Sequence, residues 1–314
     1  MTDLLASILG AVGYIALAGF ISMWARRAEA EKGRAAKMGL YLTFGFLWFI
    51  LFLIGASGVV NAWRAGEDPG TTQLFLVVSG IAAGIALIPY LRRPLARILP
   101  FDGDSYPDMI ALLFILQAGV LAGLALFIEP TDAPQVAYSE LIINALTFAS
   151  IAYIGVGLFS TRTFRDATAR LGLVRPTGRD VGIALGCVVI ALAVSVGSSV
   201  LVQWLQPEMA ERLEETLTNL TGDLDIFWAA AAIGICAAVG EELLFRGAIQ
   251  PRFGIVFTSL VFAVLHVQYE ASLLIVGLFF AGIVFGLERK YVNTTACIIT
   301  HALYNFIAVM ATFA

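Results

Sequence analysis

Residues 226–253 read IFWAAAAIGICAAVGEELLFRGAIQPRF, an apolar run that becomes charged near its middle. Its length is sufficient to cross a bilayer, because a spanning helix needs about 20 residues. Two adjacent carboxylates, Glu241 and Glu242, and the basic Arg246 lie inside it. An ionisable side chain at the centre of a membrane helix costs about 2.5 to 3.5 kcal/mol on insertion scales, so such residues tend to be functional and to face a partner.

The composition of the whole chain is that of a membrane protein. Its 314 residues are 60% hydrophobic and 13% charged, whereas soluble domains are about half apolar and about a quarter charged. We therefore predict an all-α polytopic membrane protein of about ten transmembrane helices. The apolar runs lie near residues 4–24, 38–62, 73–91, 109–128, 141–160, 181–204, 226–253, 254–268, 271–287 and 293–313. No basic footprint for nucleic acid is present.

The basic residues predict the orientation. Nearly all lysines and arginines follow the odd-numbered apolar runs, so by the positive-inside rule these loops face the cytoplasm and both termini face outward. This pattern favours the plasma membrane of a prokaryote. A basic segment near residues 161–180 is expected to lie against the inner leaflet. It divides the chain into an accessory bundle of about five helices, residues 1–160, and a functional core, residues 161–314.

Polar groups from three late helices are predicted to meet at one depth. Counted from the nearest cytoplasmic turn at 1.5 Å per residue, Glu241, His266 and Asn305 each lie about 18 Å into the membrane, and His301 lies about 12 Å in. The chain has only two histidines, and both belong to this set. Such a cluster predicts a hydrated cavity, open toward the cytoplasmic side.

The spacing of these residues also assigns them to faces. Glu242 and Arg246 are four residues apart, which favours an intrahelical ion pair with a structural role. Glu241 is turned by about 100° from its neighbour and is free to face the cavity. Phe262 lies four residues before His266 and is expected to shape the cavity by packing.

The segments EELLFR (241–246), FAVLH (262–266) and HALYN (301–305) resemble, in this order, the EExxxR, FxxxH and HxxxN motifs of the CPBP family of intramembrane proteases, also called the ABI or Rce1-like family. The resemblance covers roughly residues 170–314. It implies an intramembrane protease core in which Glu241 and His266 activate a water molecule while His301 and Asn305 donate to the oxyanion. The substrate would be a peptide or protein at the lipid bilayer, with no cofactor.

Other functions remain open on sequence grounds. Two histidines and a carboxylate are sufficient ligands for catalytic zinc, so His266, His301 and Glu241 could form a metalloprotease site, although the chain lacks HExxH. Intramembrane Glu and His residues also serve proton-coupled transporters. A non-catalytic immunity or binding protein could retain the fold. Cys297, four residues before His301, is the least favoured alternative, as a thiol nucleophile.

Overall fold

The protein is described here by a computed structural model that covers residues 2–30, 33–125, 137–221, 225–266 and 272–312. These residues form helices and no strand. Because hydrocarbon offers no hydrogen-bond partners, a spanning segment has to satisfy its own backbone, which a helix does. The expected all-α polytopic membrane fold is therefore confirmed.

Two compact units make up the chain. One contains residues 1–19 and 129–314, and the other contains residues 20–128. The first helix crosses this division. In this grouping the helix at residues 138–156 belongs with the later helices, whereas a division at residue 160 assigns it to the N-terminal bundle. The assignment of separate roles to residues 1–160 and 161–314 stays a prediction.

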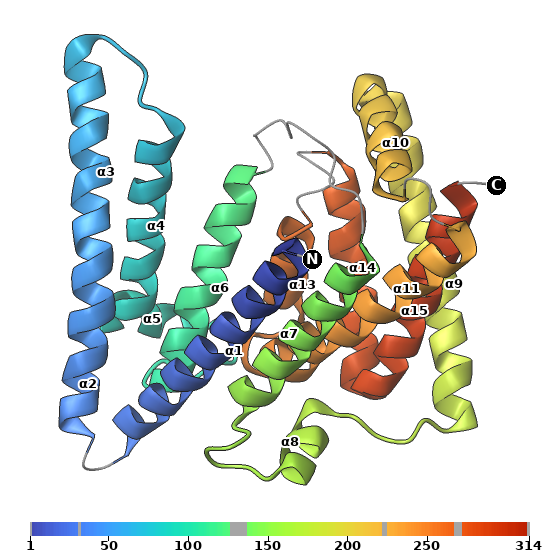
Figure 1. The fold of residues 1–314 in the computed structure, drawn as a ribbon, viewed down its shortest axis with the longest axis horizontal. Coiled ribbons are helices and arrows are strands. Elements are labelled where there is room, and N and C mark those ends of the chain that lie inside the picture. Colours follow the sequence, from blue (N-terminus) through green and yellow to red (C-terminus); the bar gives the residue numbers. More distant parts are fainter. Residues whose placement is uncertain (1, 31–32, 126–136, 222–224, 267–271, 313–314) are drawn as a thin grey trace. The chain divides into compact units, whose positions relative to one another are not determined.

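The elements of the larger unit are shown in Figure 1 from α7, in bright green, to α15, in red, together with the blue start of α1. They are α1 (Thr2–Glu29, shared with the other unit), α7 (Tyr138–Val156), α8 (Phe164–Leu171), α9 (Gly178–Leu205), α10 (Pro207–Thr221), α11 (Ile226–Glu241), η2 (Glu242–Ile249), α12 (Gln250–Phe253), α13 (Ile255–Val264), α14 (Leu274–Tyr291) and α15 (Thr294–Thr312). In this unit α11 is central, because it packs against both α7 and α15.

The smaller unit holds the rest of the described helices. They are α2 (Arg34–Leu40), η1 (Tyr41–Gly45), α3 (Phe46–Ala65), α4 (Thr71–Leu87), α5 (Pro89–Leu95) and α6 (Tyr106–Ala125). Helix α4 packs against both α3 and α6. Figure 1 shows α3 and α4 side by side in blue and teal.

Fewer helices than expected meet the length and composition of a membrane span. Within the described residues seven do so, or eight if α4 and α5, bent by 77° at their junction, form one span. The predicted count of ten is not confirmed. The predicted span at 254–268 corresponds to α13, which has only 10 residues. The span predicted at 271–287 corresponds to α14, whose last turns carry Glu288, Arg289 and Lys290.

The helix that carries the two glutamates runs as predicted from residue 226 to residue 253. Asp225 caps its start, because the carboxylate accepts from the backbone N–H groups of Phe227 and Trp228. Gly254, with a φ of 81°, ends it. Its middle part, η2, is a π-helix, a form that is rare and frequent at functional sites. Sequence spacing does not reveal such a segment.

Two glycines of α11 let its backbone approach the backbones of neighbouring helices closely. A Cβ added at Gly234 would lie 2.7 Å from the carbonyl oxygen of Ala302 in α15, and one at Gly240 would lie 2.9 Å from the Cα atom of Ala145 in α7. Small residues permit such approaches between membrane helices. The position of Glu241 relative to its neighbours therefore depends on these contacts.

We expect Gly234→Ala to lower the free energy of unfolding by about 1 to 3 kcal/mol, because the new methyl group would overpack the α11–α15 contact. Unfolding in mixed micelles with increasing denaturant measures this change. Gly197→Ala in α9 is the matched control, since a Cβ there meets nothing within 4 Å. Equal stability of the two variants would contradict the close contact.

Candidate active site

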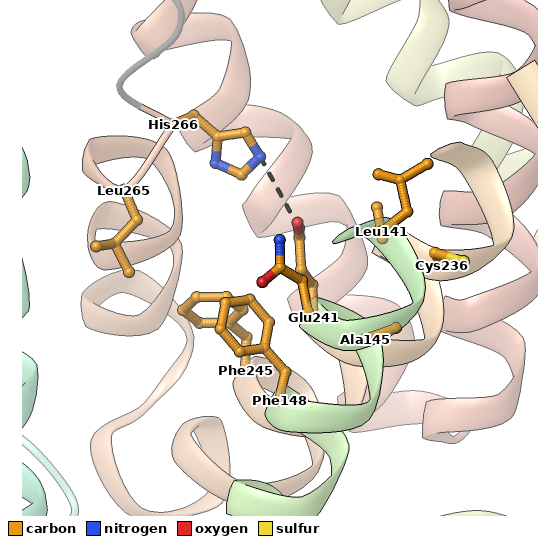
Figure 2. Close-up of a pocket in the computed structure, with 10 residues that line it drawn as sticks. Leu141, Ala145, Phe148, Cys236, Glu241, Phe245, Leu265 and His266 are labelled. Atoms are coloured by element: carbon orange, nitrogen blue, oxygen red, sulfur yellow. Dashed lines mark ion pairs between the residues drawn. The ribbon is translucent and has the colours of Figure 1, made fainter. Parts of the chain in front are cut away.

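Glu241 and His266 face each other across a gap. Glu241 Oε2 lies 3.8 Å from His266 Nε2, and the two side chains are 19% and 16% exposed. Figure 2 shows the pair, with Glu241 at the end of α11 and His266 just after α13. Their equal depth in the membrane stays a prediction. At 3.8 Å the two atoms are beyond hydrogen-bond distance, and Glu241 Oε2 is a buried atom without a hydrogen-bond partner among the described residues.

The backbone of Phe262 decides which nitrogen of His266 carries the hydrogen. His266 Nδ1 lies 2.7 Å from the carbonyl oxygen of Phe262. A carbonyl oxygen only accepts, so Nδ1 donates, and in the neutral ring Nε2 is left as an acceptor. The two rings also pack together, with centroids 4.5 Å apart. Phe262 thus fixes both the tautomer and the position of His266.

A cavity of about 360 Å³ lies at this pair, within the range of about 300 to 1,000 Å³ typical of small-molecule sites. Its polar lining includes Asn144 from α7 and Cys236 from α11, besides Glu241 and His266. Most of the remaining wall is apolar. Sequence reasoning missed Asn144 and Cys236. A signal for Asn144 was present, since it is an amide within an apolar run.

Glu242 and Arg246 form a second, fully buried cluster. Arg246 Nε lies 3.3 Å from Glu242 Oε2, and both side chains are 0% exposed. The predicted ion pair is therefore present. His301 joins it, because its Nδ1 lies 2.8 Å from Glu242 Oε1. Arg246 also donates from Nη2 to the carbonyl oxygen of Gly282 in α14, at 3.4 Å.

Aromatic rings surround the guanidinium group of Arg246. Its Cζ atom lies 4.4 Å from the ring centroid of Phe262, 5.4 Å from that of Phe285 and 5.9 Å from that of Phe245. The faces of such rings attract cations, by about 2 kcal/mol or more when the pair is desolvated. Phe285 also stacks on His301 with centroids 5.1 Å apart. This packing holds His301 beside Glu242.

His301 and Asn305 are not brought to the cavity. Neither lines it, and His301 is only 2% exposed. If His301 donates Nδ1–H to Glu242, its Nε2 can donate only when the ring is protonated. Asn305 has no hydrogen bond to Glu241, His266 or His301 within the described part of the chain. Their role as oxyanion donors stays a prediction.

A metal site is not assembled from the expected ligands. The described residues contain no group of three His, Cys, Asp or Glu side chains that could hold a metal ion. His266 approaches Glu241, while His301 pairs with Glu242. The zinc alternative of His266, His301 and Glu241 stays a prediction. Cys297 is fully buried, with Sγ 3.3 Å from the carbonyl oxygens of Phe285 and Asn293.

Comparisons with known proteins point to the same segment. The model of a family described as type II CAAX prenyl endopeptidase Rce1-like matches residues 223–307, which contain all three motifs. The lipid II flippase MurJ of Burkholderia cenocepacia is 28% identical over 216 residues, 60% of this chain and 40% of the flippase. The probable lipid II flippase MurJ of Vibrio cholerae is 29% identical over 161 residues, which are 48% of this chain and 30% of the flippase. This chain thus spans less than half of either flippase. No solved structure matches it.

We expect Arg246→Met to destabilise the protein by about 3 to 5 kcal/mol, because it leaves the Glu242 carboxylate buried without its cation. The double variant Glu242→Leu/Arg246→Met should lose less stability than the sum of the losses of the two single variants. Denaturant unfolding in micelles measures all of them. Arg93→Met is the control, since the Arg93–Asp104 pair has side chains 55% and 71% exposed and should contribute about 0 to 1 kcal/mol. A loss no larger than that of Arg93→Met would contradict the buried pair.

We also expect a small water-soluble thiol reagent to label Cys236 and not Cys297. Cys236 is half-buried and lines the cavity, whereas Cys297 is fully buried. Mass spectrometry of membranes that hold variants with one cysteine each, made by Cys→Ser changes at the other two positions, measures the labelling. Labelling of Cys297 equal to that of Cys236 would contradict the burial of Cys297, and no labelling of Cys236 would show that the reagent does not reach the cavity.

Proposed function

We propose that the protein is an intramembrane endopeptidase that hydrolyses a peptide bond of a membrane-associated substrate with a water molecule activated by Glu241 and His266. The observation that carries the proposal is the pairing of a carboxylate and an imidazole acceptor, 3.8 Å apart, at a cavity in an apolar bundle. The Rce1-like match over residues 223–307 supports it.

The pair suits the activation of water because both groups accept hydrogen bonds. One water molecule can donate one hydrogen to Glu241 and the other to Nε2 of His266. Its oxygen lone pairs then face the cavity. As this oxygen bonds to the peptide carbonyl carbon, Glu241 acts as the base and removes a proton from the water molecule. Base catalysis of this kind raises the rate by about 10²- to 10⁴-fold. When the C–N bond breaks, the same group returns the proton to the leaving amine nitrogen.

The tetrahedral intermediate also needs donors for its negative oxygen. We assign this role to His301 and Asn305, which lie four residues apart on one face of α15. Because neither lines the cavity in this structure, the assignment requires α15 to move toward the substrate when it binds. Each such donor contributes on the order of 10² to 10³ in rate. His301 Nδ1 lies 2.8 Å from Glu242 Oε1, and its Nε2 donates when the ring carries both hydrogens. Support for this assignment comes from the HALYN motif.

The substrate and its location follow from the membrane setting. The basic loops favour a prokaryotic plasma membrane, with the cavity reached from the cytoplasmic side. The family description names a prenyl endopeptidase, so a prenylated peptide that ends in Cys-aliphatic-aliphatic-X is the first substrate to test. The mechanism uses no cofactor, and cleavage should therefore survive a chelator.

Transport of a lipid-linked molecule is the second candidate, favoured by the partial similarity to two lipid II flippases. Intramembrane Glu and His residues also occur in proton-coupled transporters. The two candidates differ in their use of Glu241. Proteolysis needs this carboxylate as a base, whereas a flippase changes no covalent bond.

We expect Glu241→Gln to abolish cleavage, because an amide cannot accept the proton of the attacking water. Proteomics of protein termini in membrane fractions should show precursors that accumulate in the variant and cleavage sites that disappear. Glu140→Gln is the matched control, since Glu140 is an exposed carboxylate of α7 outside the cavity.

The same samples separate the alternatives. Cleavage that persists in Glu241→Gln would reject the proposed base, and cleavage that stops with a chelator would favour a metal site. Lipid II flux in proteoliposomes that is equal for wild type and Glu241→Gln, without any cleavage, would favour transport.

A further inference from the structure

Asn144 is an amide in a helix that is otherwise mainly apolar. It lies in α7, where its neighbours in sequence include Ile142, Ile143 and Leu146. An amide that enters an apolar medium without a hydrogen bond loses roughly 2 to 7 kcal/mol. The exposed side chain of Asn144 has no hydrogen-bond partner among the residues that the structure describes. We therefore expect the amide of Asn144 to form its hydrogen bonds with a molecule other than this chain.

The packing of α7 against α11 places this amide at the cavity. Gly240 brings the two backbones together, because a Cβ there would lie 2.9 Å from the Cα atom of Ala145. The residues next to this contact are Asn144 in α7 and Glu241 at the end of α11. Both line the same cavity. Figure 2 shows α7, with Ala145 and Leu141, beside Glu241.

Among the described residues that line the cavity, Asn144 is the strong hydrogen-bond donor. A carboxylate at Glu241 only accepts hydrogen bonds, and Nε2 of His266 accepts when the ring is neutral. The thiol of Cys236 is a weak donor. The amide of Asn144 carries two N–H donors and holds them at any pH. His301 and Asn305 do not line the cavity.

Peptide hydrolysis needs such a donor. Negative charge develops on the carbonyl oxygen when water adds to the peptide, and a fixed N–H group beside that oxygen lowers the barrier. We propose that the side-chain amide of Asn144 donates a hydrogen bond to the carbonyl oxygen of the peptide bond that is cleaved, which makes Asn144 a further catalytic residue. This inference rests on the proposed protease function. It adds a residue of the N-terminal 160 to the site.

Steady-state cleavage by the purified full-length protein in micelles tests the inference. The probe is a synthetic peptide that spans a cleavage site lost in Glu241→Gln membranes. We expect Asn144→Ala to lower kcat by about 10²- to 10³-fold, the loss measured for single oxyanion donors, with little change in KM. Asn144→Asp should be as impaired, since it has the same size and no N–H donor. Asn144→Gln should recover part of kcat.

Matched controls separate chemistry from folding. Asn61→Ala removes an exposed amide from α3 in the other unit and should leave kcat and KM unchanged. A donor role requires that Asn144→Asp loses kcat while its melting temperature equals that of the wild type. A loss of kcat that follows a lower melting temperature in all three Asn144 variants would assign a structural role and overturn the inference.

The outcomes also distinguish this inference from the proposed function. Glu241-dependent cleavage that is equal in Asn144→Ala and Asn61→Ala would overturn the role of Asn144 and leave the protease function standing. If no site depends on Glu241, the protease function fails, and the role of Asn144 fails with it.

Discussion

The ion pair between Glu242 and Arg246 is the interaction around which the site is arranged. Both side chains are fully buried, and removal of either charge would leave the other without compensation in a medium of low dielectric. Three aromatic rings and the carbonyl oxygen of Gly282 complete the surroundings of the guanidinium group. His301 attaches α15 to the same carboxylate. The pair thereby joins η2, α14 and α15.

Two adjacent glutamates consequently have different environments. Glu242 is held inside the bundle, which leaves Glu241 on the side of the cavity with His266. Phe262 connects the two regions, because its ring packs on Arg246 while its carbonyl oxygen binds His266. The buried pair fixes the helix from which Glu241 projects, and would in this way support the proposed reaction. The proposed base then needs no reorganisation before water adds.

Part of this arrangement could be predicted from sequence. The membrane class could be predicted because it depends on the average composition of the chain. The Glu242–Arg246 pair could be predicted because it depends on the local spacing of four residues. The number of spans could not be derived, since α13 has only 10 residues and α4 bends at its junction with α5. The pairing of His301 with Glu242 joins residues 59 apart. The role proposed for Asn144 depends on a contact between α7 and α11 that no motif encodes. The HALYN motif suggested donors that the structure does not place at the cavity.

The central claim is that Glu241 and His266 hold a water molecule and not a metal ion. A crystal structure in a lipidic phase, at a resolution that resolves water and with anomalous data collected above and below the zinc edge, tests it most directly. We expect a peak without anomalous signal, within about 3 Å of both Glu241 and Nε2 of His266. An anomalous peak from a metal ion ligated by both histidines would contradict the claim. Lipid that fills the site and leaves no water between Glu241 and His266 would also contradict it.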